Sequence, residues 1–231
     1  DNVRTQTMST GLKQESALPP AFEGKSRKPK QDRSRASLER MLAAARELML
    51  ERGSEEFTLQ EVSQRGNVSI GSIYLRFESK DNLVRAVIAD VNAELGTAED
   101  AMFAMLRSEC TTLVAFVPRY VEAYAEVLRQ FAPLLRLSME RAAFDPQVSG
   151  PGKARAAHAA SDATSAMLAF ADEIAGPDNE LKADACFRII FATLARQLSL
   201  GSTFESMDPI DWEQLKRELG RMTLAYLTAD I

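Results

Sequence analysis

A short stretch of the chain carries hydroxyl, guanidinium and apolar groups close together. Ile70, Gly71 and Ser72 stand together at the expected leading end of a helix, and Arg76 follows on the same segment. Ile70 can contact a thymine methyl group, and Gly71 allows the backbone to come close to the duplex. Ser72 can donate to a phosphate or a base, and Arg76 can bond bidentately to guanine or pair with a phosphate. These residue types favour binding chemistry in a major groove.

Catalytic chemistry has much less support in the sequence. The single histidine, His158, has Asp162 one helical turn later, and the two cysteines, Cys110 and Cys186, lie far apart. A metal site needs three or four ligands, so we expect no metal and no cofactor. There is no glycine-rich phosphate loop and no Ser/His/Asp set, so we expect a protein that is not an enzyme. The isolated cysteines fit a reducing compartment, and we expect a cytoplasmic protein.

Charge is distributed unevenly along the 231 residues, whose net charge is −5. Residues 25–85 carry 13 Lys/Arg against 9 Asp/Glu, a net of +4, whereas residues 86–231 carry 13 against 21. A basic segment attracts phosphate backbones, and an acidic remainder keeps the molecule away from non-specific partners. Charges or Gly/Pro breaks interrupt the longest apolar stretches well before 18 residues, so we expect no membrane span. Residues 1–24 lack an apolar core flanked by basic residues, so we expect no secretory signal.

Three short helices would position the recognition groups. A first helix is expected from Ser34 to Arg52, because its apolar residues recur at helical spacing. Thr58-Leu59-Gln60-Glu61 forms a capping box that starts a second helix. This helix ends at Gly66-Asn67, the two residue types that best tolerate a positive φ. A third helix, Ile70 to Phe77, is capped by Ser69 after a turn of three or four residues. This geometry is that of a helix-turn-helix, whose last helix enters a major groove.

The remainder of the chain also indicates helices, the first of them capped by Ser79. Further helices are expected near 99–116, 119–131, 133–143, 153–175, 180–199 and 210–228. Breaks are expected at Pro118, Pro133, Asp145-Pro146, Gly150-Pro151-Gly152, Gly176-Pro177 and Gly201. Residues 1–32 lack apolar periodicity and are expected to be a disordered tail, whose basic run is either solvated or an arm on DNA. The sequence thus predicts an all-α protein with a three-helix domain over 33–80 and a larger helical domain over 81–231.

The segment from Phe57 to Leu83 resembles the DNA-binding domain of the TetR family of transcription regulators. Its most specific part is Val-Ser-Ile-Gly-Ser-Ile-Tyr at 68–74, followed by Phe-x-Ser-Lys-x-x-Leu at 77–83. The likeness extends from Ser34 to Val87, and the remainder agrees in length and helical character. The resemblance implies an all-α homodimer with an N-terminal reading domain and a larger ligand-binding and dimerisation domain.

Two departures from the family pattern stand inside this segment. Asn67 occupies a position where the family usually has Gly, although Asn tolerates the left-handed conformation that such a turn needs. Leu75-Arg76 replaces a commonly polar or aromatic pair. The base preference of better-known members is therefore not inherited.

The resemblance also implies roles for single residues. Thr58 resembles the helix-start residue whose backbone and hydroxyl meet a phosphate, although its capping role alone would explain it. Tyr74 resembles a tyrosine whose hydroxyl meets a phosphate, with a half-buried aromatic as the alternative. Lys80 matches a phosphate-binding lysine, and Gln60 can reach a base edge or simply be solvated. The expected DNA-binding set is Thr58, Gln60, Ser69, Ile70, Gly71, Ser72, Tyr74, Arg76 and Lys80.

Two sets of apolar residues in the larger domain are candidates for a ligand pocket and for a dimer interface. Aromatic and methionine side chains can line a pocket for a small molecule or belong to ordinary core packing. That set is Phe116, Tyr120, Tyr124, Met139, Met167, Phe170 and Phe187. Stripes on the last two helices can form a four-helix dimer interface, as the resemblance implies, or pack within one subunit. That set is Phe187, Ile190, Phe191, Leu194, Leu198, Trp212, Leu215, Leu219 and Met222.

We therefore expect a homodimeric, ligand-responsive transcription regulator, a repressor by the family resemblance, that binds a palindromic operator through the helix at 70–77. Its expected partners are double-stranded DNA, a second copy of itself, and a hydrophobic or amphipathic small-molecule effector. The alternative is a helical interaction or scaffold protein that uses the helix-turn-helix to bind protein. The basic segment and the Ser72, Tyr74 and Lys80 set favour the regulator.

Overall fold

The computed structural model describes residues 28–200 and 210–230, and it confirms the all-α prediction over these ranges. A 3-10 helix, η1 (Ala171–Glu173), stands between α6 (Pro146–Leu168) and α7 (Asn179–Leu200). The helices are α1 (Lys28–Arg52), α2 (Leu59–Arg65), α3 (Ile70–Tyr74), α4 (Lys80–Glu109), α5 (Leu113–Ala142), α6 (Pro146–Leu168), α7 (Asn179–Leu200) and α8 (Trp212–Thr228). No helix in the described ranges is long and apolar enough to cross a membrane.

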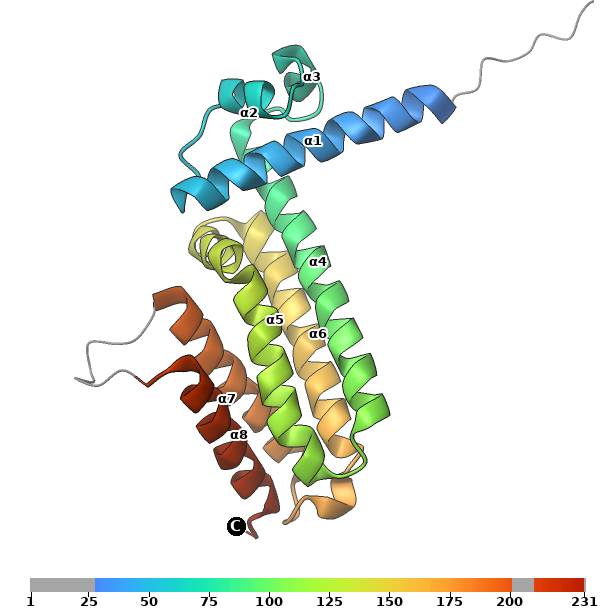
Figure 1. Cartoon of the computed structure of the whole chain (residues 1–231), viewed down its shortest axis with the longest axis vertical. Helices are drawn as coiled ribbons and strands as arrows, with labels where there is room; N and C mark the ends of the chain where they lie inside the picture. Colours follow the sequence, from blue (N-terminus) through green and yellow to red (C-terminus); the bar gives the residue numbers. More distant parts are fainter. Residues whose placement is uncertain (1–27, 201–209, 231) are drawn as a thin grey trace, which may run out of the picture.

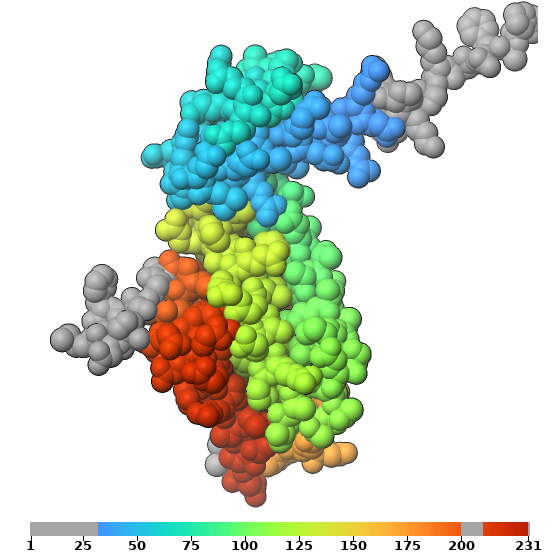
Figure 2. Space-filling view, viewed as in Figure 1, coloured from blue at the N-terminus to red at the C-terminus, as the bar shows by residue number. Residues whose placement is uncertain are grey.

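The helices are arranged in two parts along one axis. α1, α2 and α3 form one end of the elongated molecule, and α1 lies across the tops of the other helices (Figure 1). α4, α5 and α6 pack side by side, while α7 packs on α5 and α6, and α8 packs on α5 and α7. The N-terminal part covers this end of the molecule in the space-filling view (Figure 2). α4 contacts α1 as well as α5 and α6, so this one helix belongs to both parts.

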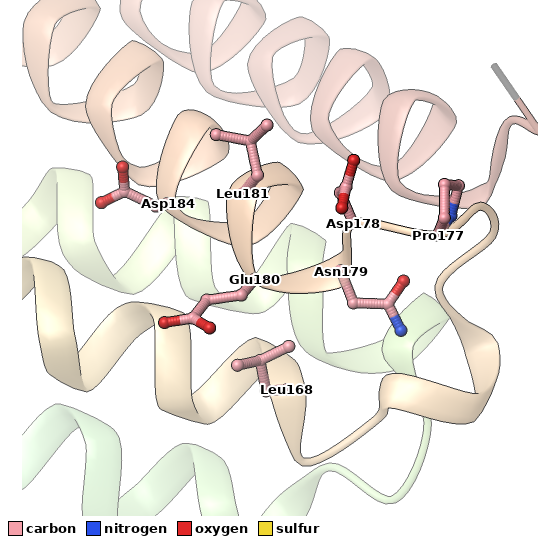
Figure 3. A pocket seen from close by; sticks show the side chains of 7 residues that line it. All are labelled: Leu168, Pro177, Asp178, Asn179, Glu180, Leu181 and Asp184. Carbon is pink, nitrogen blue, oxygen red and sulfur yellow. The ribbon is translucent and has the colours of Figure 1, made fainter.

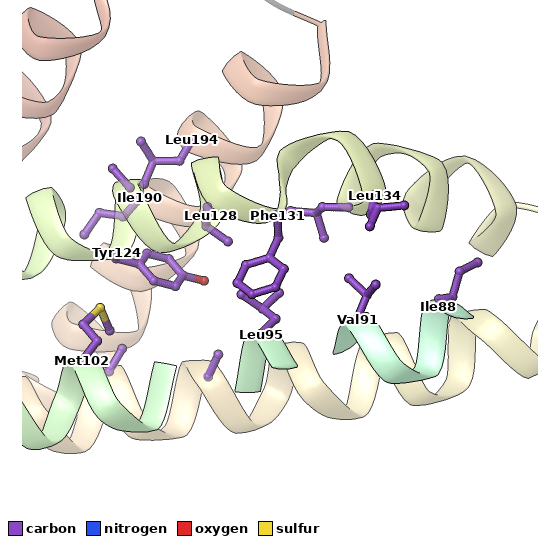
Figure 4. Close-up of a cluster of buried hydrophobic side chains, with 14 of the residues drawn as sticks. Ile88, Val91, Leu95, Met102, Tyr124, Leu128, Phe131, Leu134, Ile190 and Leu194 are labelled. Carbon is purple, nitrogen blue, oxygen red and sulfur yellow. The ribbon is translucent and has the colours of Figure 1, made fainter. Parts of the chain in front are cut away.

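The core of the larger part is apolar and centres on α5. Apolar side chains of α4 face those of α5, with α7 behind them (Figure 4). Each fully buried large side chain contributes roughly 1.5–3 kcal/mol relative to an exposed one. The residues labelled in that view are Ile88, Val91, Leu95, Met102, Tyr124, Leu128, Phe131, Leu134, Ile190 and Leu194.

The predicted breaks at Asp145-Pro146 and Gly176-Pro177 are confirmed, whereas those at Pro118, Pro133 and Gly150-Pro151-Gly152 were wrong. Pro118 and Pro133 lie inside α5, and Pro151 lies inside α6 together with its two flanking glycines. An interior proline costs about 3 kcal/mol because it removes a helical hydrogen bond. The buried face of α5 runs without interruption past both prolines, and its burial offsets that cost. The break instead falls at Cys110–Thr112, where the Thr112 hydroxyl caps α5 by accepting from the Ala115 N–H.

Several predicted helix ends also moved. α1 begins at Lys28 and not at Ser34, so residues 28–32, expected to belong to a disordered tail, are helical. α3 ends at Tyr74, three residues before the expected Phe77. The Asp211 side chain caps α8 by accepting from the Gln214 N–H at 2.7 Å. Residues 1–27, with the first part of the basic run, and the expected break at Gly201 lie outside the described residues.

Candidate functional site

The turn between α2 and α3 has the predicted caps, and its positive φ falls on Asn67 and not on Gly66, whose φ is −79°. The capping box is confirmed: the Thr58 hydroxyl accepts from the Glu61 N–H at 3.2 Å, and the Glu61 carboxylate accepts from the Thr58 N–H at 2.7 Å. The side chain of Arg52 also binds this carboxylate, and with Thr58 it lowers the pKa of Glu61 to about 2. Asn67 has a φ of +47°, in the left-handed region that Asn tolerates.

Gly66 allows α1 and α2 to come close together. A Cβ atom at this position would lie 2.9 Å from the Arg40 carbonyl oxygen and 3.3 Å from the Ala44 Cβ. Behind this contact, in the part formed by α1, α2 and α3 (here called the small domain), Met41, Met49, Val62 and Ile73 are fully buried in a core that continues into α4. The helix-turn-helix is therefore a packed scaffold that can hold α3 in one orientation.

α3 presents a polar face with an apolar tip to the outside. Ser69 caps the helix by accepting from the Ser72 N–H at 3.1 Å, and its hydroxyl lies 2.7 Å from that of Ser72. Gly71 is exposed, and a Cβ there would meet nothing within 4 Å. Tyr74 is 60% exposed and Leu75 is 88% exposed. Only an external partner could use this surface fully, because Ile73 alone of the helix is buried.

Leu75 is a residue that the sequence reasoning left out of the expected DNA-binding set. The sequence did carry a sign of its exposure. Leu75 stands two residues after the buried Ile73, a spacing that turns it away from the buried side of the helix. An almost fully exposed leucine beside Tyr74 adds apolar surface at the end of α3.

Gln60 and Thr58 lie on the exposed side of α2, and Ile70 is half-buried at the start of α3. Arg33 and Arg35 are exposed on the first turns of α1, which extends away from the rest of the small domain (Figure 1). Described residues of the basic run are therefore helical, which does not fit a flexible arm over that stretch.

The structure gives Arg76 and Lys80 partners within the chain. Arg76 Nη2 donates to the Ser34 carbonyl oxygen at 2.5 Å, so this residue links the end of α3 to α1. Lys80 Nζ donates to the Glu55 carbonyl oxygen at 2.8 Å and lies 5.3 Å from the centre of the Phe57 ring. An ammonium group has three donors, so Lys80 retains hydrogens for a phosphate while it is held in place.

An ion cluster centred on the buried Arg141 and Asp145 joins the small domain to the larger one. Arg141 of α5 is 6% exposed, and it donates to Asp145 at 2.9 Å, to Glu55 at 2.6 Å and to Asp81 at 2.8 Å. Arg85 of α4 donates to the same Asp145 oxygen at 2.8 Å. The hydrogen bond from Arg85, together with that from Arg141, lowers the pKa of Asp145 to about 2. The corner between α5 and α6 is thus tied to the α1–α2 loop and to the start of α4.

A cavity of about 550 Å³ lies beside this corner. We call it the α5–α6 cavity. Its wall is mainly apolar, and its volume lies in the range typical of small-molecule sites. Residues on both sides of Arg141 and Asp145 line it. The lining includes Leu135, Met139, Ala142, Val148, Arg155 and Phe191.

The residues predicted to line a ligand pocket separate into two groups. Met139 lies on the wall of the α5–α6 cavity and is 44% exposed. Phe116, Tyr120 and Tyr124 are instead stacked in a row along the inner face of α5, with ring centres 5.6–5.7 Å apart. Phe170 and Phe187 extend this row at its two ends, and Met167 is fully buried. Sequence alone could not separate lining from core, because both use the same side chains.

A buried polar cluster interrupts this apolar interior. It consists of Glu99 of α4, Tyr120 and Tyr124 of α5, and Arg155 of α6. Arg155 Nη1 donates to both carboxylate oxygens of Glu99 at 2.9 Å. Burial raises the pKa of Glu99 and of both tyrosine hydroxyls. Across the described residues, the oxygens of both tyrosines and Nε of Arg155 are buried without a hydrogen-bond partner.

The predicted dimer residues lie mostly within the subunit. Phe187, Ile190 and Leu194 of α7 and Leu219 of α8 are buried in the chain's own core, and Phe191, Leu198, Trp212 and Leu215 are partly buried. Met222 differs, because 64% of it is exposed. The buried Lys216 fastens α8 to α5 by donating to Glu122 at 2.6 Å and to Glu126 at 2.8 Å. The inward faces of both stripes are therefore already occupied.

The outward faces of α7 and α8 carry other apolar residues. On α7, Leu181 and Ile189 are exposed, and they lie two turns apart with small residues between and beyond them. On α8, Tyr226 is exposed one turn after Met222. The sequence analysis did not select Ile189 for the dimer interface, because the neighbouring Ile190 continues the longer apolar stripe, which is buried in the structure.

Two further features bring acidic side chains together at the surface. A hollow of about 770 Å³ at the start of α7 is lined by three carboxylates, Asp178, Glu180 and Asp184 (Figure 3). It is open and acidic. Asp100 joins His158 and Asp162, so that their ligand atoms lie within 4.8 Å of one another at the surface. The sequence reasoning missed Asp100, because it stands on a different helix.

Part of the chain matches a known protein family in sequence. Residues 41–87 match the profile of "Bacterial regulatory proteins, tetR family". This span contains the turn, α3 and the start of α4. No curated protein sequence matches the chain.

Solved structures share the fold of nearly the whole chain. A protein from Mesorhizobium loti, described as a TetR-family transcriptional regulator, aligns with a TM-score of 0.61 at 18% identity, over 87% of this chain and 95% of its own. A TetR-family regulatory protein from Rhodococcus RHA1 aligns with a TM-score of 0.59 at 16% identity, over 83% and 96%. GusR from Salmonella enterica aligns with a TM-score of 0.58 at 20% identity, over 84% and 96%. The N-terminal part of this chain thus matches the tetR family of bacterial regulatory proteins in sequence, and the chain as a whole has the fold of solved TetR-family regulators.

Proposed function

We propose that the protein is a homodimeric repressor that binds a palindromic operator through α3 and releases it when a small molecule enters the α5–α6 cavity. The observation that carries this proposal is the Arg141 ion cluster, since it connects the wall of that cavity to the element that holds α3. Regulation, and not catalysis, is the activity of the family.

The DNA-binding surface is the outward face of α3 with the residues around it. Gly71, Ser72 and Tyr74 offer close backbone approach and hydroxyl donors, and Leu75 adds an apolar contact. Lys80 stands at the N-terminal end of α4, where its ammonium group can meet a phosphate. Thr58, Gln60, Ser69 and Ile70 flank the same face. Arg76 acts by holding α3 against α1, and a direct contact with guanine would require it to leave Ser34.

A ligand in the cavity can act on this surface through few intermediates. Met139 and Ala142 of α5 line the cavity on either side of Arg141 in sequence. Arg141 binds the Glu55 carboxylate, and the Glu55 carbonyl oxygen accepts from Lys80. A ligand that fits one position of this corner better than another will therefore shift the populations of two orientations of the small domain.

Homodimerisation is proposed through the outward faces of α7 and α8. Leu181, Ile189, Met222 and Tyr226 are exposed apolar residues on these neighbouring helices. A two-fold axis through this face would pair two copies of each helix. The two α3 helices fit successive major grooves when they lie about 34 Å apart.

The DNA-binding proposal is tested by selection from random duplexes with the purified protein at about 150 mM salt, because affinity depends on salt. We expect an enriched palindrome whose half-sites are one helical turn apart. Tyr74→Phe and Lys80→Ala should weaken binding to the enriched duplex. A folded dimer that enriches no sequence would refute the proposal and favour the protein-binding alternative.

The dimer proposal is tested by light scattering on Ile189→Asp and Met222→Asp. Each should convert a dimer into a monomer, because a buried charge without a partner opposes association. Val114→Asp is the matched control, since Val114 is 61% exposed on α5, outside the proposed face. Dimers in all three variants would place the interface elsewhere.

A further inference from the structure

We propose that the α5–α6 cavity binds an amphipathic monoanion, whose acidic head lies against Lys153 and whose hydrocarbon part lies against α5 and α7. This inference rests on the ligand-responsive part of the proposed function, and it names the chemical class of the ligand.

The apolar part of the ligand follows from the side of the cavity that α5 and α7 form. Leu135, Met139 and Phe191 present carbon and sulfur surface to a space of about 550 Å³. Met139 and Phe191 also line a second, mainly apolar hollow of about 410 Å³ between α5 and α7, so the two hollows adjoin. A hydrocarbon chain gains free energy by displacing water from such surfaces. An entirely polar ligand would leave this side without favourable contacts.

The polar part follows from the side chains that α4 and α6 contribute to the same cavity. Asn92 of α4 and Ser149 and Lys153 of α6 line it. Within the described ranges, none of these three side chains has a hydrogen bond or an ion pair with the rest of the chain. Each of them can therefore donate to a ligand without giving up a bond inside the protein.

The sign of the charge follows from the cations of the wall. The lining contains Lys153 and Arg155 and no aspartate or glutamate, although residues 86–231 carry 21 Asp/Glu against 13 Lys/Arg. Arg155 already donates to both carboxylate oxygens of Glu99 at 2.9 Å, so its charge is matched. Lys153 is exposed, and its flexible four-carbon stem allows the ammonium group to follow a head group. One cation without a counter-ion beside an apolar space matches one anionic group.

Other head groups fit this wall less well. A neutral head can accept from Asn92 and Ser149, but it leaves the charge of Lys153 unmatched. A cationic head meets a like charge at the same place, which opposes binding. The order of affinity at equal chain length is therefore anion, neutral molecule, cation.

The test is calorimetry on the protein without DNA, with decanoate, 1-decanol and decyltrimethylammonium as probes of equal chain length. We expect decanoate to bind about three- to tenfold more tightly than 1-decanol, as expected for one charge-assisted hydrogen bond at a partly exposed site. Decyltrimethylammonium should bind most weakly. Octanoate, which is two methylene groups shorter, should bind roughly tenfold more weakly than decanoate, because each buried methylene contributes about fourfold.

The variants locate the head group. Lys153→Gln should remove the advantage of decanoate over 1-decanol and leave the binding of 1-decanol unchanged. Lys153→Glu should reverse the order, so that decyltrimethylammonium binds more tightly than decanoate. Both variants should keep the melting temperature, because the Lys153 side chain is exposed and has no partner to lose among the described residues. Arg107→Gln is the matched control, since Arg107 is exposed on α4 and lies outside the cavity lining.

Three results would overturn the inference. They are no binding of decanoate, binding of 1-decanol as tight as that of decanoate, and an equal effect of Lys153→Gln on both probes. The proposed function is judged separately, by adding decanoate to the protein on its selected duplex. Binding of decanoate without a loss of DNA affinity would support the ligand class and reject ligand-responsive repression.

Discussion

Gly71 offers the sharpest test of how α3 is used. The residue is exposed near the start of α3, its φ is not positive, and an added Cβ would meet no atom of the chain within 4 Å. Nothing within the described fold therefore explains a glycine there. Alanine would favour the helix by roughly 0.5–1 kcal/mol, so Gly71→Ala should be as stable as the original protein or slightly more stable.

The same methyl group should oppose DNA binding. If the Gly71 backbone lies against the duplex, an extra carbon forces a shift that costs about 1–3 kcal/mol, as overpacking does in protein cores. Two subunits on a palindrome double this to about 2–6 kcal/mol, and each 1.4 kcal/mol is a factor of ten. We therefore expect Gly71→Ala to bind the selected duplex at least about 30-fold more weakly.

The assay is fluorescence anisotropy at about 150 mM salt, with thermal unfolding measured on the same samples. Gly96→Ala is the matched control, because Gly96 lies in the middle of α4 and an added Cβ there also meets nothing within 4 Å. Gly96→Ala should show a similar change in stability with no change in affinity. If Gly71→Ala bound as tightly as the control, α3 would not approach the duplex closely, and the orientation argued for it would be wrong.

Three further predictions concern stability. The φ of Asn67 is +47°, so Asn67→Gly should raise the free energy of unfolding by a few tenths of a kcal/mol, and Asn67→Ala should lower it by about 1 kcal/mol. Urea unfolding of both variants measures the difference in stability between them. Gly66→Ala should lower the free energy of unfolding by about 1–3 kcal/mol, since the added Cβ would lie 2.9 Å from the Arg40 carbonyl oxygen. An unchanged urea midpoint for this variant would contradict the prediction. The pKa of Asp145 is lowered from 3.8 to about 2, so its ionised carboxylate stabilises the fold above about pH 4. This contribution to the free energy of unfolding should be lost as the pH falls toward 2. Urea midpoints measured across that range should fall less steeply for Asp145→Asn than for the original protein.

Local signals in the sequence were sufficient for the helix caps and the turn of the small domain. The capping box at Thr58, the caps at Ser69 and Ser79, and the positive φ of Asn67 all involve residues within three or four positions of one another. Such features depend on short-range hydrogen bonds and backbone preferences, which the residue types encode directly. The length of α3 was misjudged because Phe77 is buried, although the helix has already ended at Tyr74.

Long-range features could not be predicted in the same way. Arg141 binds Glu55 and Asp81, which lie 86 and 60 positions away in sequence. Pro118 and Pro133 read as helix breakers because their local cost is visible, while the packing that offsets it depends on α4, α7 and α8. The α5–α6 cavity is likewise a property of several helices, and only Met139 among its lining residues had been singled out for a ligand.

The unbroken course of α4 has a mechanical consequence. This helix contains 30 residues, and a rise of about 1.5 Å per residue makes it about 45 Å long. A tilt of only about 5° around its far end would carry Lys80 through about 4 Å. Opposite tilts in two subunits would change the separation of the two α3 helices by about twice that amount, against a required spacing of about 34 Å. In the proposed dimer, a side-chain rearrangement of ordinary size around a ligand, magnified along α4, would therefore be enough to move both copies of α3 out of register, and no part of the fold would need to open.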